Sequence, residues 1–343
     1  MLTKKDAKMA QGLAIIGMVM LHLFCRLDNL PYNVHTFIDA TPLLYYLGLF
    51  GDLCIPVFCF CSGYAQYVLI DKSKNYKQER LIRIKGFVTH YWIVLILFSL
   101  VGLVFQSKDL PGSILEFMGN MFLYRLTYNG AWWFVITYIF LILIFPYIHK
   151  LVDQTNPFIV FMLSGGIYFV AYLCEMIWPD LFQNRILAWI YAQLYLLGRT
   201  QFPFIVGMLF YKFRIIETLR AKIKNKRFIS VSLMAVVVMM IVLHAVEQSM
   251  IMAPITGLVT LTCFHLWNKP RCIEQLLLFL GKHSTNIWLT HMFFYMVLFK
   301  DLVFIVREPL LILILTFAIC IAVSYLINGI ENVLNRFCKR VQA

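Results

Sequence analysis

Residues 309–328 read PLLILILTFAICIAVSYLIN, a run of twenty residues with no charged side chain. A helix needs about 20 consecutive apolar residues to cross the hydrocarbon core of a bilayer. The run does not alternate apolar and polar residues with a period of two, as a strand of a transmembrane β-barrel would. We therefore predict a membrane-spanning helix here and a membrane location for the chain.

The rest of the sequence has the same character. Hydrophobic residues account for 61% of the 343 residues and charged residues for 14%, whereas soluble domains carry about 25% charged residues. We expect an all-α fold, a polytopic integral membrane helix bundle that forms a single transmembrane domain over residues 1–343. Ten apolar windows predict its helices, at about residues 9–27, 43–70, 86–106, 130–150, 157–177, 188–211, 227–246, 250–267, 284–300 and 309–328.

The distribution of positive charge predicts the topology. Of the 30 Lys and Arg residues, 23 lie at the two termini and in alternate loops, 6 in the opposite loops and one, Arg199, inside a helix window. Cytoplasmic loops carry the excess of Lys and Arg, so both termini are predicted to be cytoplasmic. The first apolar run is too long for a signal peptide and lacks a cleavage site, so we expect it to be retained. Membrane topology and anionic lipids account for the net charge of +13, and nucleic acid is not an expected partner.

Several chemistries are not supported by the residue pattern. No pair of cysteines or histidines has the spacing of zinc ligands, so no metal site is expected. The sequence has no Gly-x-Ser-x-Gly motif, and small residues at a helix interface explain Ser62-Gly63-Tyr64 equally well. Cysteines inside apolar windows are expected to be small buried hydrophobes, among them Cys54, Cys59, Cys61, Cys174, Cys263 and Cys320.

Polar residues inside the predicted helices are the candidate functional residues, because an ionisable group in hydrocarbon needs a partner or a cavity. Gln11 and His22 are eleven residues apart, about three helical turns, so both point to one side and stand about 16 Å apart along the axis. Asp52 lies at a depth similar to that of His22 in a helix of opposite direction, and we predict that the two meet. A carboxylate beside an imidazole suits removal of a proton from a hydroxyl group, and a packing hydrogen bond is the alternative.

Two further groups of cationic side chains need an explanation. Arg199, at mid-helix, requires an anion, which is Asp52, Glu175 or a bound ligand. Arg80 and Arg83, spaced i and i+3 on the cytoplasmic side, share one helix face and suit phosphate binding. A solvated loop end would explain this Arg pair equally well.

The remaining intramembrane histidines divide into two kinds. His291 follows Thr290, with Asn286 one turn earlier, so a polar stripe at helical spacing is predicted to face the interior of the bundle. His244 and His265 have no such polar neighbours and are expected to be core or interface histidines.

Six short motifs occur in order along the chain. They are Gln11 to His22 in the first helix, Pro56-Val-Phe58 followed by Ser62-Gly63-Tyr64, Arg80-Leu-Ile-Arg83, Gly130-Ala-Trp132-Trp133-Phe134, Arg199 with Gly207-Met208, and Leu280-Gly281-Lys-His-Ser284 with His291. Together they resemble the acyltransferase 3 family, bacterial integral membrane enzymes that move acyl groups, most often acetyl, onto cell-envelope carbohydrates. The resemblance covers the whole chain.

This resemblance implies a membrane-bound acyltransferase that moves an acyl group from acyl-CoA to a hydroxyl of a cell-surface carbohydrate. We expect Arg80 and Arg83 to hold the coenzyme A phosphates, with the pantetheine arm beside the first helix and the thioester near His22. Asp52 would orient His22. Among the motif residues, Arg199, His291, Ser62 and Trp133 are expected to contact substrate or to be structural.

The chain departs from the family pattern at one position. The family has a basic residue where this sequence has Gln11, and Lys8, one turn earlier on nearly the same face, is a candidate substitute. Some members carry an additional extracytoplasmic esterase-like domain, which we do not expect here.

Alternatives stay open at the level of the sequence. The same fold resembles proteins described as exporters of surface glycans, so a polysaccharide or lipid-linked sugar exporter is the rival function, although the inverted repeats of many transporters are not evident. His22 acts either as a general base or as an acylated nucleophile. We expect the protein in the bacterial cytoplasmic membrane, with acceptor specificity in the outer loops at residues 26–41 and 107–130.

Overall fold

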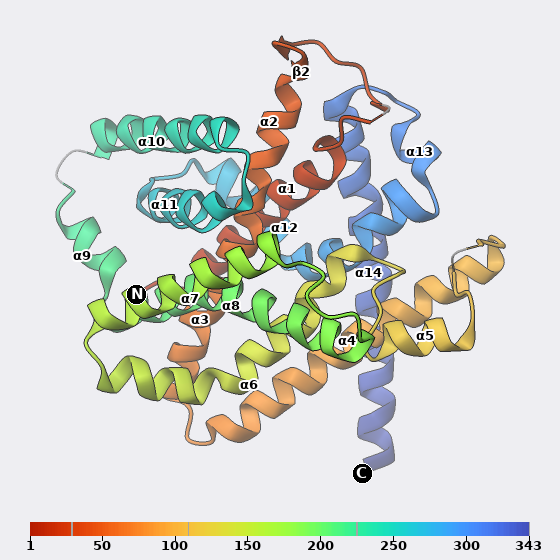
Figure 1. The fold of residues 1–343 in the computed structure, drawn as a ribbon, viewed down its shortest axis with the longest axis horizontal. Coiled ribbons are helices and arrows are strands. Elements are labelled where there is room, and N and C mark those ends of the chain that lie inside the picture. The colour runs from red at the N-terminus through yellow and green to blue at the C-terminus, as the bar shows by residue number, and fades with distance from the viewer. Residues whose placement is uncertain (29, 109, 224–225, 343) are drawn as a thin grey trace. The chain divides into compact units, whose positions relative to one another are not determined.

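A computed structural model describes residues 1–28, 30–108, 110–223 and 226–342 and is all-α apart from one short ribbon (Figure 1). The ribbon pairs Phe37–Ile38 (β1) with Thr41–Pro42 (β2) in antiparallel register. The α-helices are α1 (Lys4–Phe24), α2 (Leu43–Leu49), α3 (Cys54–Lys72), α4 (Tyr76–Val104), α5 (Ile114–Met121), α6 (Trp133–Gln154), α7 (Pro157–Ile177), α8 (Arg185–Lys212), α9 (Ile215–Ala221), α10 (Lys226–Val246), α11 (Ala253–Leu266), α12 (Arg271–Met292), α13 (Lys300–Phe304) and α14 (Pro309–Gln342). Shorter turns are η1 (Phe50–Leu53), η2 (Gly130–Trp132), η3 (Met250–Met252) and the π-helical η4 (Phe293–Val297).

The prediction of an all-α polytopic membrane protein is confirmed. Among the described residues, seven helical segments are long and apolar enough to span a membrane: 4–24, 43–72, 76–104, 130–154, 157–177, 229–246 and 309–337. All ten predicted windows fall on helices. Ten crossings stay a prediction, because α8 and α12 are more polar than these segments and α11 is shorter.

Several helices begin earlier than their apolar windows, and α1 and α4 are two of them. In α1, the side chain of Thr3 accepts a hydrogen bond from the backbone of Asp6 (3.1 Å), and the Asp6 carboxylate accepts one from the backbone of Thr3 (2.8 Å). This capping box satisfies free N–H groups of the first turn, so the helix starts at Lys4. Helix α4 starts at Tyr76 and therefore includes Arg80 and Arg83. Polar residues in the first turns of these two helices are thus helical although hydropathy alone places them in a loop.

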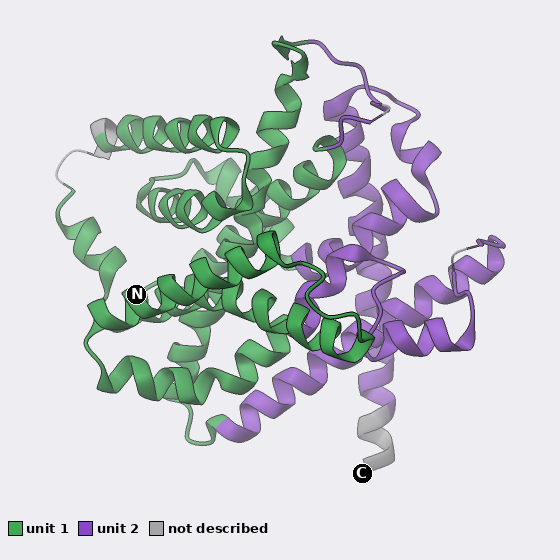
Figure 2. Ribbon diagram, viewed as in Figure 1, with its two compact units in different colours: residues 1–25, 36–76, 137–282 green, residues 26–35, 77–136, 283–343 purple. Residues whose placement is uncertain are grey.

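The chain divides into two compact units that interleave along the sequence (Figure 2). Unit 1 consists of residues 1–25, 36–76 and 137–282, and unit 2 of residues 26–35, 77–136 and 283–343. The expectation of a single domain over the whole chain stays a prediction.

Close helix packing in unit 1 depends on glycine. Gly63 of α3 lies against the backbone of Phe204, and Gly207 of α8 lies against the backbone of Phe60. A Cβ atom at either glycine would overlap the neighbouring backbone, so the helices approach as closely as small residues allow in membranes. Gly63 therefore has the helix-interface role that we considered for Ser62-Gly63-Tyr64.

Aromatic side chains and indole hydrogen bonds hold unit 2 together. Trp132 is fully buried, and its Nε1 donates to the carbonyl oxygen of Leu289 (3.0 Å). In the reverse direction, Nε1 of Trp288 donates to the carbonyl oxygen of Ala131 (2.9 Å). These bonds use the polar end of each indole in an apolar surrounding and fix the start of α6 against α12.

The outer segment that follows α4 forms a short amphipathic helix, α5. Ser113 caps it by accepting from the backbone of Glu116 (3.2 Å). Its apolar residues Ile114 and Leu115 are 84% and 76% exposed, whereas Asn120 is fully buried and its carbonyl oxygen accepts from the Tyr91 hydroxyl (2.7 Å). A helix of this length and pattern fits the membrane interface and not a crossing.

We predict that Gly63→Ala destabilises the protein and that Gly166→Ala does not. The added methyl at Gly63 meets the Phe204 backbone, which cannot move as a flexible side chain can, and such overpacking destabilises by about 1–3 kcal/mol. Nothing lies within 4 Å of a Cβ at Gly166, so this variant controls for helix propensity. Thermal unfolding in detergent measures both. Equal midpoints for the two variants would contradict the packing role of Gly63.

Candidate functional site

The N-terminal half of α1 carries two polar side chains in an apolar surrounding. Nζ of Lys8 donates to the carbonyl oxygen of Gly281, the glycine of the Leu280-Gly281-Lys motif, at 3.2 Å. Gly281 lies against the backbone of Lys8, so its missing side chain lets α12 approach α1. Oε1 of Gln11 is buried and has no hydrogen-bond partner among the described residues. Leaving such an oxygen unpaired costs about 1–3 kcal/mol, which indicates a place for a hydrogen-bond donor from a ligand.

The C-terminal half of α1 packs on η1 through small residues. Gly17 contacts Gly51, and a Cβ atom at Gly51 would lie 3.0 Å from Cβ of Leu21. His22 is the next residue of the helix, about 100° further around the axis, and is half-buried. The position of η1 therefore sets the position of the helix turn that carries His22.

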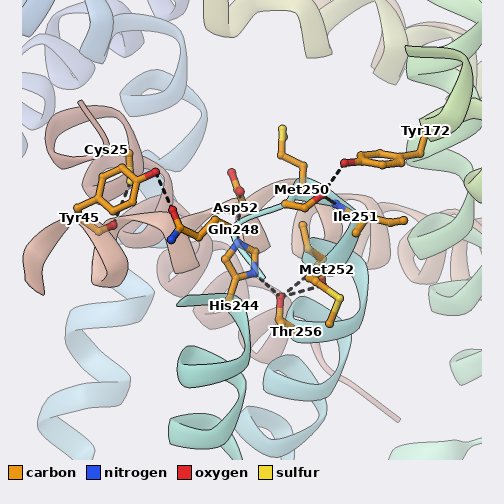
Figure 3. Close-up of polar contacts among 12 residues, drawn as sticks. Cys25, Tyr45, Asp52, Tyr172, His244, Gln248, Met250, Ile251, Met252 and Thr256 are labelled. Atoms are coloured by element: carbon orange, nitrogen blue, oxygen red, sulfur yellow. Dashed lines mark hydrogen bonds and ion pairs between the residues drawn. The ribbon is translucent and has the colours of Figure 1, made fainter. Parts of the chain in front are cut away.

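Asp52, in η1, forms an ion pair that the sequence did not predict (Figure 3). Its Oδ2 lies 3.4 Å from Nε2 of His244 in α10, and Nδ1 of His244 lies 3.4 Å from the hydroxyl of Thr256 in α11. Asp52 is 5% exposed and His244 is fully buried. Because a carboxylate accepts, Nε2 of His244 is the donor in this contact.

The His244 contact gives Asp52 a partner that we did not predict. The predicted meeting of Asp52 with His22 stays a prediction. His244, which we expected to be a core histidine without polar neighbours, has a carboxylate on one side and a hydroxyl on the other. No local pattern indicated it, because Asp52 and His244 are 192 residues apart in the chain.

A catalytic triad has the order carboxylate, imidazole and hydroxyl, which Asp52, His244 and Thr256 also have. The Thr256 hydroxyl, however, is not accessible to a substrate. Thr256 is fully buried, and its hydroxyl already donates to the carbonyl oxygen of Met252 (3.1 Å). A nucleophile has to reach its substrate, and this hydroxyl does not. The arrangement therefore joins η1, α10 and α11, which lie beside one another in unit 1 (Figure 1).

Arg199 pairs with one of the anions that we predicted for it. It forms an ion pair with Glu175 of α7, and its guanidinium lies 5.9 Å from the ring centroid of Tyr172. Glu175 and not Asp52 therefore neutralises Arg199. Ser62, one residue before the helix-interface glycine, is half-buried in α3.

The predicted Arg pair belongs to unit 2. Arg80 is half-buried and Arg83 is exposed, both in the first turns of α4. The helix is continuous through both, so their side chains share one face as predicted. Phosphate binding by this pair stays a prediction.

Unit 2 contains a hydrogen-bonded network that the sequence did not predict. Nδ1 of His90 in α4 lies 2.9 Å from Oε2 of Glu331 in α14, and its Nε2 lies 2.5 Å from Oδ1 of Asn286 in α12. The amide nitrogen of Asn286 then donates to Oδ1 of Asn328 (3.0 Å) and to Ser324 (2.7 Å). Each ring nitrogen of His90 therefore lies within hydrogen-bonding distance of an oxygen atom. The apolar window ended at residue 328 and did not include Glu331, so the sequence did not indicate this carboxylate as a partner of His90.

The polar stripe of α12 is buried as predicted. His291 and Thr290 are fully buried, and Nδ1 of His291 donates to the carbonyl oxygen of Trp288 (2.8 Å). Trp133, the candidate tryptophan of the Gly130 motif, is half-buried at the start of α6. Its neighbour Trp132 makes the indole bond to α12 described above. Within the described ranges, no group of three or more His, Cys, Asp or Glu side chains is arranged to hold a metal ion.

Comparison with known proteins gives one match. A family model described as an acyltransferase domain, of the acyltransferase 3 type, matches residues 7–329. The comparisons with curated proteins and with solved structures find no match. The match extends over both units and includes every candidate residue predicted from the sequence.

We predict that Asp52 and His244 stabilise the protein as a pair. Removing one partner of a buried pair leaves the other uncompensated and costs about 3–5 kcal/mol. Asp52→Asn and His244→Gln should each lower the midpoint of thermal unfolding in detergent, and the double variant should fall no lower than either single variant. His265→Gln is the matched control, because neither ring nitrogen of this buried histidine has a hydrogen-bond partner among the described residues. Additive effects of the two changes would contradict the pair.

Proposed function

This chain belongs to the acyltransferase 3 family, and from that premise we propose that it transfers an acyl group, acetyl in the first instance, from acyl-CoA to a hydroxyl of a cell-surface carbohydrate. The coarser statement, a multi-pass membrane acyltransferase, rests on the family match and on the apolar helices. The donor is cytosolic and the acceptor belongs to the envelope. The proposal therefore includes location in the bacterial cytoplasmic membrane, with acceptor O-acetylation as the product.

The observation that carries the proposal is the unpartnered amide oxygen of Gln11. The pantetheine arm of coenzyme A contains two amide N–H groups, and an amide oxygen is the acceptor that such groups require. Gln11 stands where the family has a cation. In our proposal it binds the arm through a hydrogen bond, while Lys8 beside it supplies the positive charge.

Arg80 and Arg83 are the phosphate ligands in this proposal. Guanidinium groups bind phosphate oxygens through two parallel N–H donors, and Arg83 is exposed to solvent as a binding residue has to be. Coenzyme A carries a diphosphate and a 3′-phosphate. Two arginines on one face of α4 would place two positive charges beside these negatively charged phosphate groups.

His22 acts as the general base. It removes the proton of the acceptor hydroxyl while the hydroxyl oxygen attacks the thioester carbonyl, and the carbon–sulfur bond then breaks. The proton passes from His22 to the coenzyme A sulfur, so the products are an ester and a free thiol. The rise from Gln11 to His22, about 16 Å, suits the length of an extended pantetheine arm.

Asp52 is a positioning residue in this mechanism. Its ion pair with His244 fixes η1, and Gly51 of η1 packs against Leu21, the residue before His22. Arg199 contributes through its ion pair with Glu175 to the packing of α7 on α8. In this proposal Ser62, Trp133 and His291 contact substrate or are structural.

Donor binding is the first test. We expect calorimetry to detect saturable binding of acetyl-CoA to the detergent-purified protein, with affinity lowered at least tenfold in Arg80→Ala/Arg83→Ala, since each lost charged hydrogen bond contributes about 1.5–3 kcal/mol. Gln11→Met keeps the size of the side chain but removes the amide oxygen, and should weaken binding about fivefold.

Lys85→Ala is the control for donor binding. Lys85 is exposed two residues after Arg83, on another side of α4, so its loss should leave acetyl-CoA affinity unchanged. A folded wild-type protein that fails to bind acetyl-CoA would refute the enzyme and favour the glycan exporter.

The role of His22 has a separate test. His22→Ala should lower acetyl-CoA-dependent thiol release with envelope acceptor at least about 100-fold, because a positioned general base contributes 10²–10⁴ in rate. The affinity for acetyl-CoA should stay within about twofold of wild type. His265→Gln serves as the histidine control, and thiol release by His22→Ala at the wild-type rate would rule out this base.

A further inference from the structure

Unit 2 contains a polar cavity that the mechanism above does not use. It has a volume of about 450 Å³ and lies between the loop that follows α1 and the segment from α13 to α14. Its walls include Tyr32, Asn33, Lys300, Asp301, Phe304 and Arg307. Small-molecule sites measure about 300–1,000 Å³, so the cavity is large enough for one or two sugar units.

Hydrogen bonds hold the two walls of this cavity together. The backbone N–H of Asn33 donates to the carbonyl oxygen of Arg307 (2.8 Å), and its side-chain amide donates to Oε1 of Glu308 (2.6 Å). His35 binds the other carboxylate oxygen of Glu308 at 2.8 Å. The hydrogen bonds from Asn33 and His35 lower the pKa of Glu308. The cavity is therefore built by ordered contacts, and Arg307 is held with φ of 51°, in the left-handed region.

The charged side chains of the walls are available to a ligand. Lys300, Asp301 and Arg307 are exposed, and within the described part of the chain none of the three side chains forms an ion pair or a hydrogen bond. Two cations face one carboxylate, so the lining has an excess of positive charge. Asn33 uses its amide nitrogen for Glu308, which leaves its carbonyl oxygen as an acceptor.

These groups match an acidic sugar better than other small ligands. Asp301 and the Asn33 carbonyl accept from ring hydroxyls, and Arg307 binds a carboxylate through two parallel N–H groups, with Lys300 as a second cation. Phe304 offers an apolar ring against which the C–H face of a sugar packs. The two wall segments lie in loops predicted to be opposite the Lys- and Arg-rich side, where envelope carbohydrate is found.

We propose that this cavity binds a carboxylate-bearing sugar residue of the acceptor glycan. The inference rests on the proposed function for its acceptor class, and it adds a named subsite and a charge preference. Residues 300–307 lie outside the two loops in which we expected acceptor specificity. They line the same cavity as the loop at residues 26–41 only because the fold brings the two segments together.

Saturation-transfer NMR on the full-length protein in detergent tests the subsite, with methyl glucuronide, methyl glucoside and glycerol phosphate as probes. Wild type should bind methyl glucuronide saturably and about fivefold more tightly than methyl glucoside, since one exposed ion pair contributes up to about 1 kcal/mol. Arg307→Gln and, independently, Lys300→Gln should each remove this preference. Asp301→Asn should weaken both sugars. Lys108→Gln, an exposed outer cation outside the cavity, should change nothing.

Three results would overturn the subsite. The first is no saturable binding of either sugar by folded wild type. The second is an unchanged preference in both cation variants. The third is tighter binding of glycerol phosphate than of the glucuronide, which would assign the cavity to a lipid headgroup.

Acetyl-CoA calorimetry on the same samples separates this inference from the proposed function. If acetyl-CoA binds and the sugars do not, only the subsite fails. If the sugars bind with the expected preference and acetyl-CoA does not, the cavity stands as a glycan site and the transferase proposal fails.

Discussion

The absence of water from the hydrocarbon core is the constraint on which the structure of this protein depends. Each polar group placed there needs a partner within the protein, and the pairs that result decide how the helices meet. Arg199 pairs with Glu175, and Asp52 pairs with His244. His90 contacts Glu331 and Asn286. Each of these contacts joins different helical elements. Gln11 is an informative exception, because its amide oxygen, like the ring nitrogens of His265, is buried without a partner among the described residues. An oxygen kept in that condition is a candidate contact for a ligand.

Glycine and polar pairing act together in placing the reactive part of α1. Gly51 allows η1 to touch α1 at Gly17 and Leu21, and the neighbouring Asp52 ties η1 to His244. A change at Asp52 or His244 is therefore transmitted to the turn that carries His22 without contact with substrate. The same reasoning separates the roles of two adjacent residues in unit 2, where Trp132 binds the α12 backbone and Trp133 begins α6.

Sequence reasoning succeeded where the signal is local or repeated. The apolar windows located the ten helical regions, and the order of six motifs indicated the family that the match over residues 7–329 shows. It failed for contacts between distant segments. The pairing of His22 with Asp52 rested on equal depth alone and stays a prediction, whereas no local signal indicated the contact of Asp52 with His244. His90 and Glu331 went unnoticed because a lone histidine and a carboxylate beyond an apolar window look unremarkable until α4, α12 and α14 come together.

The sequence by itself determined the membrane class, the helical fold and the family of this protein, because hydropathy, charge bias and short motifs depend on the order of neighbouring residues. Only the tertiary structure decided which partner each buried charge takes and where a cavity forms. The walls of the outer cavity are the clearest case, since Asn33 and Arg307 lie far apart in the chain and become neighbours through a backbone hydrogen bond of 2.8 Å. Such contacts depend on how the helices pack, and no local pattern encodes them.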